Sequence, residues 1–363
     1  MPATRTITIP AGRRARILVV DDSAVIRRLV TATLEQVVDF EVVGTAANGK
    51  IALGKVEQLD PDVITMDIEM PEMNGLEALK VLRAKHCRSK IIIFSTLSER
   101  GGQLTLEALS LGADDYATKA SKAGSLDKSI LTLKDELVPK IRHLLSWQTS
   151  ARPPRPAPAQ STAELMLAPR ASRALVRRAL VIGISTGGPM ALGEIIPMFP
   201  ANFSVPVLIV QHMPPMFTRL LAERLQTRSR LEVREAQQND AVVAGRILIA
   251  PGDRHLRVRN AGGKIIATLD EGPPENSCRP AADVLFRSAA EVWGGAVVAA
   301  VLTGMGQDGL KGTRALAELG AYVVAQDEAS SVVWGMPGAV VGAGLAHSVV
   351  SLDKIVEEIR KQF

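Results

Sequence analysis

This sequence predicts an α/β protein with two doubly wound, mostly parallel sheets joined by a proline- and arginine-rich linker. Short runs of Val, Ile, Leu and Ala alternate with segments of helical periodicity on both sides of residue 150, a pattern typical of βα units. Hydrophobic residues make up 47% of the chain and aromatic residues only 3%, which suits buried strands with aliphatic cores. Residues 151–160 are rich in proline, which fixes φ and lacks an amide donor, so neither sheet nor helix continues there.

The segment before the linker contains five apolar runs, each followed by a helical pattern. We expect strands at residues 16–20, 40–45, 62–66, 91–95 and 116–118, and helices at residues 23–37, 49–59, 75–85, 103–111 and 125–145. Five such units complete one doubly wound parallel sheet. This half is expected to form a (βα)5 domain over residues 15–146, followed by a flexible linker over residues 147–172.

The segment after the linker repeats the alternation with other spacings and is expected to form a second domain over residues 173–361. Its expected strands lie at residues 179–184, 205–210, 246–250, 296–302 and 321–325, and its helices at residues 189–198, 217–227, 281–292 and 309–319. Residues 258–269, with Gly262 and Gly263 in the middle, have the pattern of a β-hairpin. The second half is therefore also α/β and mostly parallel, with a Rossmann-like sheet.

Charge and composition exclude several classes of protein. The net charge of +5 resides in residues 151–178, where six arginines are opposed by one glutamate, and the rest of the chain is neutral. A basic linker of this kind is usually a solvated segment, so we expect no nucleic-acid partner. No apolar run approaches the ~20 residues that cross a bilayer, and the polar start lacks a signal-peptide core, so we expect a cytoplasmic protein without membrane insertion. Cys87 and Cys278 lie in different halves and are expected to be reduced and without a role.

Carboxylates follow two strands of the first half. Asp21 and Asp22 come at the end of the first strand, and Asp67 comes at the end of the third. Because the carboxyl ends of parallel strands share one edge of the sheet, three carboxylates would crowd together there. Such crowding is tolerable with a cation, and an all-oxygen site suits Mg²⁺. A single aspartate in such a place is more often a helix cap.

Two further strand ends complete this set. Ser95 ends the fourth strand with a hydroxyl, and Lys119 follows the fifth with an ammonium group. A metal ion and a lysine neutralise phosphoryl oxygens, and a hydroxyl hydrogen-bonds one of them. The four strand ends together therefore predict a carboxylate that accepts a phosphoryl group.

The first half resembles a response-regulator receiver domain over about residues 15–140. The motifs that carry the resemblance are Val-Val-Asp-Asp-Ser at residues 19–23, Met-Asp-Ile-Glu-Met-Pro-Glu-Met-Asn-Gly at residues 66–75 and Gly-Ala-Asp-Asp-Tyr-Ala-Thr-Lys at residues 112–119. The resemblance implies that Asp67 is the phosphorylation site and that a histidine kinase is the phosphodonor.

The same resemblance assigns the other residues of the pocket. It implies a magnesium site with Asp22 and Asp67 as ligands, Asp21 in support and the backbone carbonyl of Glu69. Tyr116 resembles the aromatic residue that changes rotamer together with Ser95. The family usually has proline after the lysine, whereas this chain has Ala120, so the loop geometry there is expected to differ.

A glycine-rich turn follows the first strand of the second half. Ser185 lies in Gly183-x-Ser-x-Gly187 between an apolar strand and a helical pattern, an arrangement that exposes a serine hydroxyl above a sheet. Such turns also bind phosphates, and a dinucleotide site requires an acidic residue after the next strand. Here the next strand is followed by His212. A histidine suits a general base, so a serine hydrolase is favoured over a dinucleotide-binding fold.

Other histidines and aspartates are alternatives to the residues that we favour. His212 follows its strand directly, and His255 is the only serious rival because it also follows a strand. Asp308 lies in a glycine-rich loop after a very apolar strand, where a buried carboxylate would hold the imidazole. The competing aspartates are Asp240, Asp253 and Asp283. The order serine, histidine, aspartate differs from that of α/β-hydrolases, so we expect a different fold family.

Residues 173–361 resemble the catalytic domain of the chemotaxis protein-glutamate methylesterases. The segments that carry this resemblance are residues 183–188, 211–214, 303–309 and 330–337. The resemblance implies a catalytic triad of Ser185, His212 and Asp308, with Thr186 and Met305 lining the site.

This second resemblance also implies a function. The expected reaction is hydrolysis of glutamate γ-methyl esters on the cytoplasmic helices of chemoreceptors, with possible deamidation of glutamines, in sensory adaptation. The implied partners are methylated chemoreceptors and a chemotaxis histidine kinase; Mg²⁺ serves receiver phosphorylation, and ester hydrolysis needs no cofactor. The receiver half would cover the active site until it is phosphorylated. The alternative is a non-catalytic adaptor whose second half only binds a partner.

Overall fold

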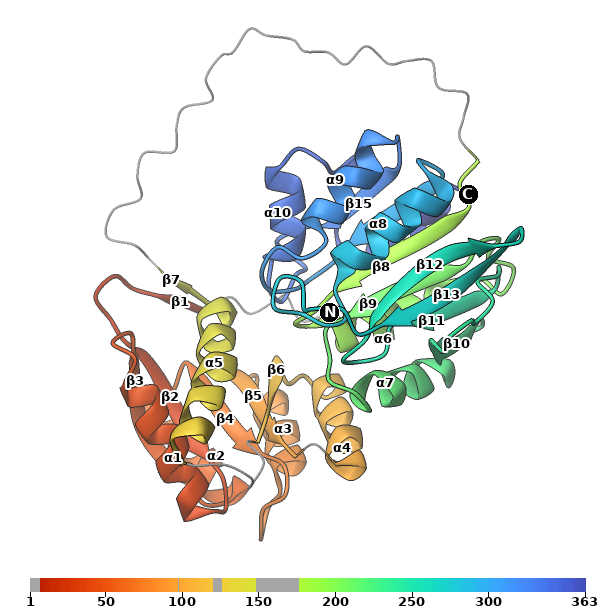
Figure 1. Cartoon of the computed structure of the whole chain (residues 1–363). Coiled ribbons are helices and arrows are strands. Elements are labelled where there is room, and N and C mark those ends of the chain that lie inside the picture. Colours follow the sequence, from red (N-terminus) through yellow and green to blue (C-terminus); the bar gives the residue numbers. More distant parts are fainter. Residues whose placement is uncertain (1–6, 97, 120–125, 148–175) are drawn as a thin grey trace, which may run out of the picture.

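Two α/β units make up the computed structural model, which describes residues 7–96, 98–119, 126–147 and 176–363 (Figure 1). Each unit is a parallel sheet with helices on both faces, so the predicted fold class is confirmed. The expected linker lies outside the described residues except at its first residue, Trp147. Among the helices of the described ranges, none has the length and apolar character that a membrane crossing requires.

The first unit is a five-stranded sheet in the order β3–β2–β4–β5–β6, with every neighbouring pair parallel. Its strands are β2 (Ala15–Val20), β3 (Phe40–Ala46), β4 (Val63–Asp67), β5 (Lys90–Ser95) and β6 (Asp115–Thr118). Its helices are α1 (Ala24–Glu35), α2 (Gly49–Leu59), α3 (Gly75–Ala84), α4 (Glu99–Ser110) and α5 (Leu126–Leu144). All five predicted strands and all five predicted helices are present.

Two features of this unit differ from the prediction. Helix α4 begins at Glu99 rather than at residue 103, because the Ser98 hydroxyl accepts a hydrogen bond from the Gly101 amide (3.0 Å) and caps the helix. A small parallel pair of strands, β1 (Ile7–Ile9) and β7 (Leu145–Trp147), was not expected. It joins the start of the described chain to the end of α5.

The second unit is a seven-stranded parallel sheet in the order β10–β11–β9–β8–β14–β15–β16. Its strands are β8 (Ala179–Ile184), β9 (Val207–Gln211), β10 (Glu232–Glu235), β11 (Arg246–Ile249), β14 (Val297–Val301), β15 (Tyr322–Gln326) and β16 (Ser348–Val350). Its helices are α6 (Gly188–Ile195), α7 (Phe217–Gln226), α8 (Ala282–Trp293), α9 (Leu310–Glu318), α10 (Met336–Gly342) and α11 (Leu352–Arg360), and a short 3₁₀ turn, η1 (Ile196–Met198), follows α6.

The prediction lacks the two edge strands of this sheet, β10 and β16. Both are short, and β10 reads Glu-Val-Arg-Glu, with Glu232 paired to Arg246 of β11 at 2.8 Å. Charged edges of this kind resist edge-to-edge pairing with other sheets but have no apolar run to signal a strand. The expected hairpin is present and longer than predicted, as β12 (His255–Ala261) and β13 (Lys264–Asp270).

Strand β8 lies between β9 and β14 at the centre of the second sheet. The chain crosses to opposite sides of β8 to form these two neighbours, so the strand order reverses here. Residues of β8, β9 and β14 are buried throughout. Ligands of open parallel sheets bind at the carboxyl ends of the strands beside such a reversal.

The two units pack against each other through β6 and α4 of the first and α7 of the second (Figure 1). The Tyr116 and Phe217 rings stack with centroids 5.3 Å apart. A Cβ at position 102 would lie 2.7 Å from Leu220 Cδ1, so Gly102 allows α4 to lie close to α7. Arg219 of α7 adds an ion pair with Glu99 of α4 at 2.9 Å.

Candidate active site and phosphoacceptor pocket

The acidic residues of the first unit meet at the carboxyl ends of β2 and β4. Asp21, Asp22 and Asp67 each place an oxygen within 4.8 Å of the others. The Lys119 ammonium lies 2.9 Å from Asp21 Oδ2 and 2.8 Å from Asp67 Oδ2. Burial raises the pKa of Asp67, and the hydrogen bond from Lys119 only partly offsets that effect. The structure therefore brings together the three carboxylates and the lysine singled out in the sequence.

This donor set fits a divalent cation. Three carboxylates are opposed by one lysine, and all the potential ligand atoms are hard oxygens, which Mg²⁺ prefers. Asp22 is exposed, whereas Asp21 and Asp67 are buried, so the cluster is open to solvent on one side. The resemblance to receiver domains implies a Mg²⁺ site here, and these residues are suited to hold the ion.

Ser95 adjoins this pocket, because the Lys119 amide donates to its carbonyl (2.7 Å), whereas Tyr116 and the Glu69 side chain contact other parts of the molecule. The buried Ser95 hydroxyl donates to the Gly101 carbonyl (3.1 Å) at the start of α4. Tyr116 faces the second unit, where it stacks on Phe217, and the Lys140 ammonium lies 4.6 Å from the centre of its ring. Glu69 is exposed and pairs with Arg100 at 3.1 Å. Ala120 lies outside the described residues.

Ser185 lies in the turn between β8 and α6. Gly187 has φ of +79°, a conformation that favours glycine, and it closes this turn. The Ser185 amide donates to the Thr303 carbonyl at the end of β14 (3.0 Å). The Ser185 carbonyl accepts from the Gln211 side chain at the end of β9 (3.0 Å). The ends of both neighbouring strands thus hold the turn, and Ser185 is half-buried beside the cavity there.

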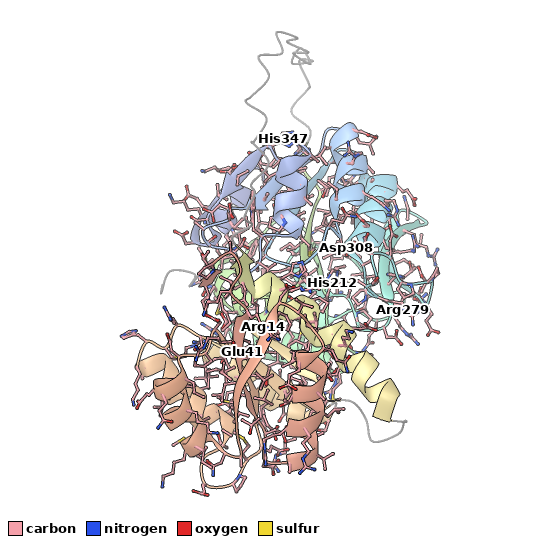
Figure 2. All side chains as sticks on the ribbon, turned by 90° about the vertical axis from the view of Figure 1, so that its left-hand side faces the viewer. Arg14, Glu41, His212, Arg279, Asp308 and His347 are labelled. Atoms are coloured by element: carbon pink, nitrogen blue, oxygen red, sulfur yellow. The ribbon has the colours of Figure 1, made fainter. Side chains whose placement is uncertain are left out.

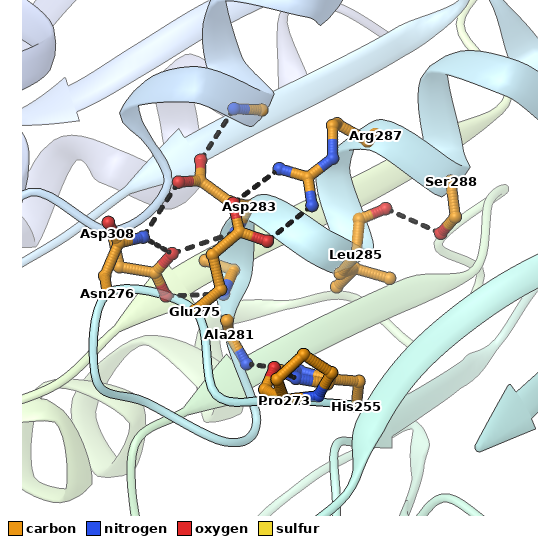
Figure 3. Close-up of polar contacts among 12 residues, drawn as sticks. His255, Pro273, Glu275, Asn276, Ala281, Asp283, Leu285, Arg287, Ser288 and Asp308 are labelled. Atoms are coloured by element: carbon orange, nitrogen blue, oxygen red, sulfur yellow. Dashed lines mark hydrogen bonds and ion pairs between the residues drawn. The ribbon is translucent and has the colours of Figure 1, made fainter. Parts of the chain in front are cut away.

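His212 and Asp308 form a direct pair between the end of β9 and the loop after β14 (Figure 2). His212 Nε2 lies 2.7 Å from Asp308 Oδ2. The buried Asp308 carboxylate also accepts from the Ala282 amide (2.6 Å), the Asp283 amide (3.1 Å) and the Asn276 side chain (2.9 Å). Two of these donors are orphan amides at the N-terminus of α8, where a negative charge is favoured (Figure 3).

This environment keeps Asp308 ionised and the imidazole basic. Burial alone would raise the pKa of Asp308, but the hydrogen bond with His212 and those from the α8 amides lower it overall. Burial would lower the pKa of His212, but hydrogen bonds with Asp308 and then Cys278 raise it well above its ordinary value. A carboxylate so placed stabilises an imidazolium, as the acid of a serine–histidine–aspartate site must.

The competing residues have structural roles. His255 has both ring nitrogens on backbone groups, with Nδ1 accepting from the Ala281 amide (3.2 Å) and Nε2 beside the Pro273 carbonyl (3.1 Å) (Figure 3). The other three aspartates bind within the scaffold: Asp240 pairs with Arg234 (2.8 Å), Asp253 accepts from Arg279 (2.9 Å), and Asp283 accepts from the Gly312 amide (2.6 Å) and Asn276 (2.9 Å). The Asn276 amide group thus bridges Asp283 and Asp308, so Asp283 supports the site indirectly.

Thr186 and Met305 line a cavity of about 490 Å³ together with Ser185 and His212. The cavity lies between the two units, because Asp115 and Lys140 of the first unit also line it. The Thr186 hydroxyl donates to Asp115 Oδ2 across this boundary (3.2 Å). Burial raises the pKa of Asp115, although the nearby Lys140 opposes that rise. Thr186, the residue directly after Ser185, is thus hydrogen-bonded to the first unit.

Ser185 and His212 share this cavity, but among the described residues no hydrogen bond joins them. Three other contributors were missed in the sequence: Asn276, Asp115 and Cys278. Cys278 is a free thiol, as expected, but its Sγ lies 3.6 Å from His212 Nδ1, a contact with the candidate site that was not expected. Asn276 and Cys278 lie on a turn that reaches the cavity from outside the strand ends, so no local pattern identifies them.

Comparison with known families identifies both units. Residues 17–131 match the response regulator receiver domain, and residues 180–359 match the CheB methylesterase domain. The chain is therefore a response regulator with a hydrolase domain as its output.

Full-length relatives narrow this class to one family. A Trichodesmium erythraeum protein named protein-glutamate methylesterase/protein-glutamine glutaminase is 46% identical over 95% of this chain and 97% of its own length. A Nocardioides protein of the same name is 50% identical over 96% of this chain and 95% of its own length. The crystal structure of the Thermotoga maritima CheB methylesterase catalytic domain has 43% identity and a TM-score of 0.51, and the match covers 52% of this chain and 99% of that one. The chain belongs to the protein-glutamate methylesterase/protein-glutamine glutaminase family. Membership of a family of hydrolases does not favour the alternative that the second unit is a non-catalytic adaptor.

Proposed function

We propose that this chain hydrolyses glutamate γ-methyl esters on chemoreceptors and that phosphorylation of its receiver domain controls the reaction. Deamidation of receptor glutamines is part of the same proposal, because an amide reacts through the same acyl-enzyme chemistry. The observation that supports it most strongly is the buried His212–Asp308 pair, which shares one cavity with Ser185. The proposed substrates are the cytoplasmic helices of chemoreceptors, so the reaction would take place in the cytoplasm.

Ser185 is the nucleophile in this proposal. Asp308 occupies Nε2 of His212, so Nδ1 is the nitrogen that takes the proton as Ser185 Oγ attacks the ester carbonyl. His212 then gives this proton to the departing methoxy group, which leaves as methanol. Water, deprotonated in the same way, attacks the acyl-enzyme and releases the glutamate carboxylate and the serine. Backbone amides at Thr186 and Met305 are the proposed donors to the oxyanion.

Asp67 is the proposed phosphoacceptor. Asp21, Asp22 and Asp67 would hold Mg²⁺, which neutralises phosphoryl oxygens when it is bound. Lys119, which already contacts Asp67, would bind a further phosphoryl oxygen. A chemotaxis histidine kinase is the proposed donor.

Phosphorylation would act on the docked receiver domain. Asp115 and Tyr116 lie on β6, the strand that pairs with β5 and leads directly to Lys119 of the acceptor pocket. Both contact the catalytic unit. A shift of β6 or α4 after phosphorylation would weaken these contacts and open the cavity to a receptor helix. Docking of this kind is a two-state element that a local change of charge can bias.

Replacement of Asp67 with alanine is expected to abolish activation while leaving basal hydrolysis. The variant lacks the carboxylate that takes the phosphoryl group, so a small-molecule phosphodonor such as acetyl phosphate should not raise its rate of methanol release. The Asp39→Ala variant serves as the control and should be activated like wild type, because the half-buried Asp39 carboxylate pairs with Arg142 outside the acceptor pocket. Equal activation of wild type and Asp67→Ala would remove receiver phosphorylation from the account.

Replacement of Asp115 with alanine is expected to raise basal hydrolysis about fivefold without a phosphodonor. The change removes the hydrogen bond between Asp115 and Thr186, and the loss of about 1 kcal/mol of docking free energy shifts a two-state equilibrium by this factor. The measurement is methanol release by the full chain, with thermal unfolding recorded to establish that the receiver stays folded. An unchanged basal rate in a folded variant would show that docking does not restrain the active site.

A further inference from the structure

Both ring nitrogens of His212 are engaged in this structure. Nε2 binds Asp308 at 2.7 Å, and Nδ1 lies 3.6 Å from Cys278 Sγ, within the range of a hydrogen bond to sulfur. Ser185 therefore has no free nitrogen on the imidazole that is proposed to activate it. The cysteine contacts the same nitrogen that the serine hydroxyl requires.

The turn that carries Cys278 is firmly held. Glu275 and Cys278 exchange two backbone hydrogen bonds (3.0 and 2.9 Å), and Arg287 of α8 binds both oxygens of Glu275 (2.8 and 2.5 Å). Between them Asn276 and Ser277 have φ of +51° and +62°, the left-handed conformation of the central residues of a two-residue turn, which asparagine tolerates better than most residues. Asn276 supplies part of that restraint through Asp308 and Asp283 (Figure 3).

We propose that Cys278 is the resting-state partner of His212: its thiol occupies Nδ1, competes with Ser185 for the general base, and is a site whose alkylation inactivates the esterase. This inference rests on the proposed function. A neutral imidazole has one unprotonated nitrogen, which accepts one hydrogen bond. A thiol is a weak donor, so a serine hydroxyl aligned by bound substrate displaces it readily.

The other charged groups around His212 are paired among themselves. Asp308 binds the ring directly, and Asp283 lies behind it on Asn276 and the Gly312 amide. The rest of the charged surroundings consists of Arg279 with Asp253, Arg287 with Glu275, and Lys140 with Asp115 and Glu136. Among the described residues, Cys278 is the group that contacts Nδ1. A single substitution can remove its thiol without leaving a charged side chain unpaired.

Treatment of the full chain with iodoacetamide tests the modification. The Cys278 sulfur attacks the methylene carbon, a carbon–sulfur bond forms, iodide leaves, and the thiol proton passes to solvent. The added group would lie beside His212 Nδ1 in the cavity that Ser185 also lines, so we expect loss of more than about nine-tenths of ester hydrolysis as Cys278 becomes labelled. The Cys87→Ser variant should lose activity in the same way, whereas Cys278→Ser should resist the reagent.

The pH profile of kcat/KM tests the competition itself. The contact with Cys278 withholds Nδ1 from Ser185, and the free base is the reactive form. Cys278→Ala should therefore raise kcat/KM at neutral pH and on the plateau of the profile by about threefold, because Ser185 no longer competes with a thiol for this nitrogen. Cys278→Ser keeps a neutral hydrogen-bonding group and should lie between wild type and Cys278→Ala.

The outcomes separate this inference from the proposed function. An active wild-type chain that stays active when mass spectrometry finds Cys278 fully labelled would overturn the inference alone, as would a kcat/KM that Cys278→Ala leaves unchanged at neutral pH. Inactivation of Cys278→Ser at the wild-type rate would do the same. A wild-type chain that releases no methanol would overturn the proposed function and this inference with it.

Discussion

Replacement of Ser185 with alanine is expected to lower ester hydrolysis by the full chain by about 10⁴- to 10⁶-fold, the range seen when a serine nucleophile is removed from a triad. The turn that holds Ser185 is fixed by backbone and Gln211 contacts, none of which involves the hydroxyl. The variant should therefore fold normally and lose only the group that attacks the carbonyl. The measurement is methanol release from a methylated receptor fragment.

Two controls make this result specific. The exposed Ser204→Ala variant should hydrolyse the ester like wild type, and Ser185→Ala should still incorporate phosphate at Asp67, because the acceptor pocket lies in the other unit. Retention of more than a trace of activity in pure Ser185→Ala would rule out this serine as the nucleophile.

Replacement of Asp308 with asparagine is expected to lower kcat by about 10³- to 10⁴-fold. The amide is neutral, so it cannot stabilise an imidazolium, and its NH₂ group would oppose donors that now point at the carboxylate. These donors are the His212 ring, the Ala282, Asp283 and Gly309 amides, and the Asn276 side chain. The variant should also unfold at lower temperature, because a buried donor loses its acceptor.

Asp353→Asn provides the matched control, since Asp353 is exposed on α11 far from the site in sequence. It should keep both the wild-type rate and the unfolding temperature. A fall in kcat of less than tenfold for folded Asp308→Asn would mean that Asp308 is a helix-capping residue and no member of the catalytic machinery.

The parallel sheets could be predicted because their central strands are buried on both faces. Strands such as β8 and β14 are apolar runs, and a polar residue, Ser185 or Thr303, comes within two positions of the end of each. The edge strands β10 and β16 lack such runs, and pairing of β1 with β7 depends on segments more than a hundred residues apart. The local sequence pattern thus identifies strands that are buried on both faces of a sheet, and it misses short strands that are paired only at an edge.

The candidate site follows the same rule. His212 and Asp308 could be singled out because each follows a central strand, and the structure joins them by a hydrogen bond. Cys278 and Asn276 approach from a turn before α8 whose position depends on the Glu275–Arg287 pair and on Asp283. Asp115 reaches Thr186 only because the two units dock. A contact between two separate helices, strands or turns cannot be recognised from the sequence pattern of either segment alone.

The most direct test of the account is the rate of methanol release from a methylated chemoreceptor fragment by the full wild-type chain, measured with and without acetyl phosphate and Mg²⁺. We predict measurable release without the phosphodonor and a faster release with it. Absence of release under both conditions, from a chain that is folded and takes up phosphate, would contradict the proposal that this response regulator is an esterase.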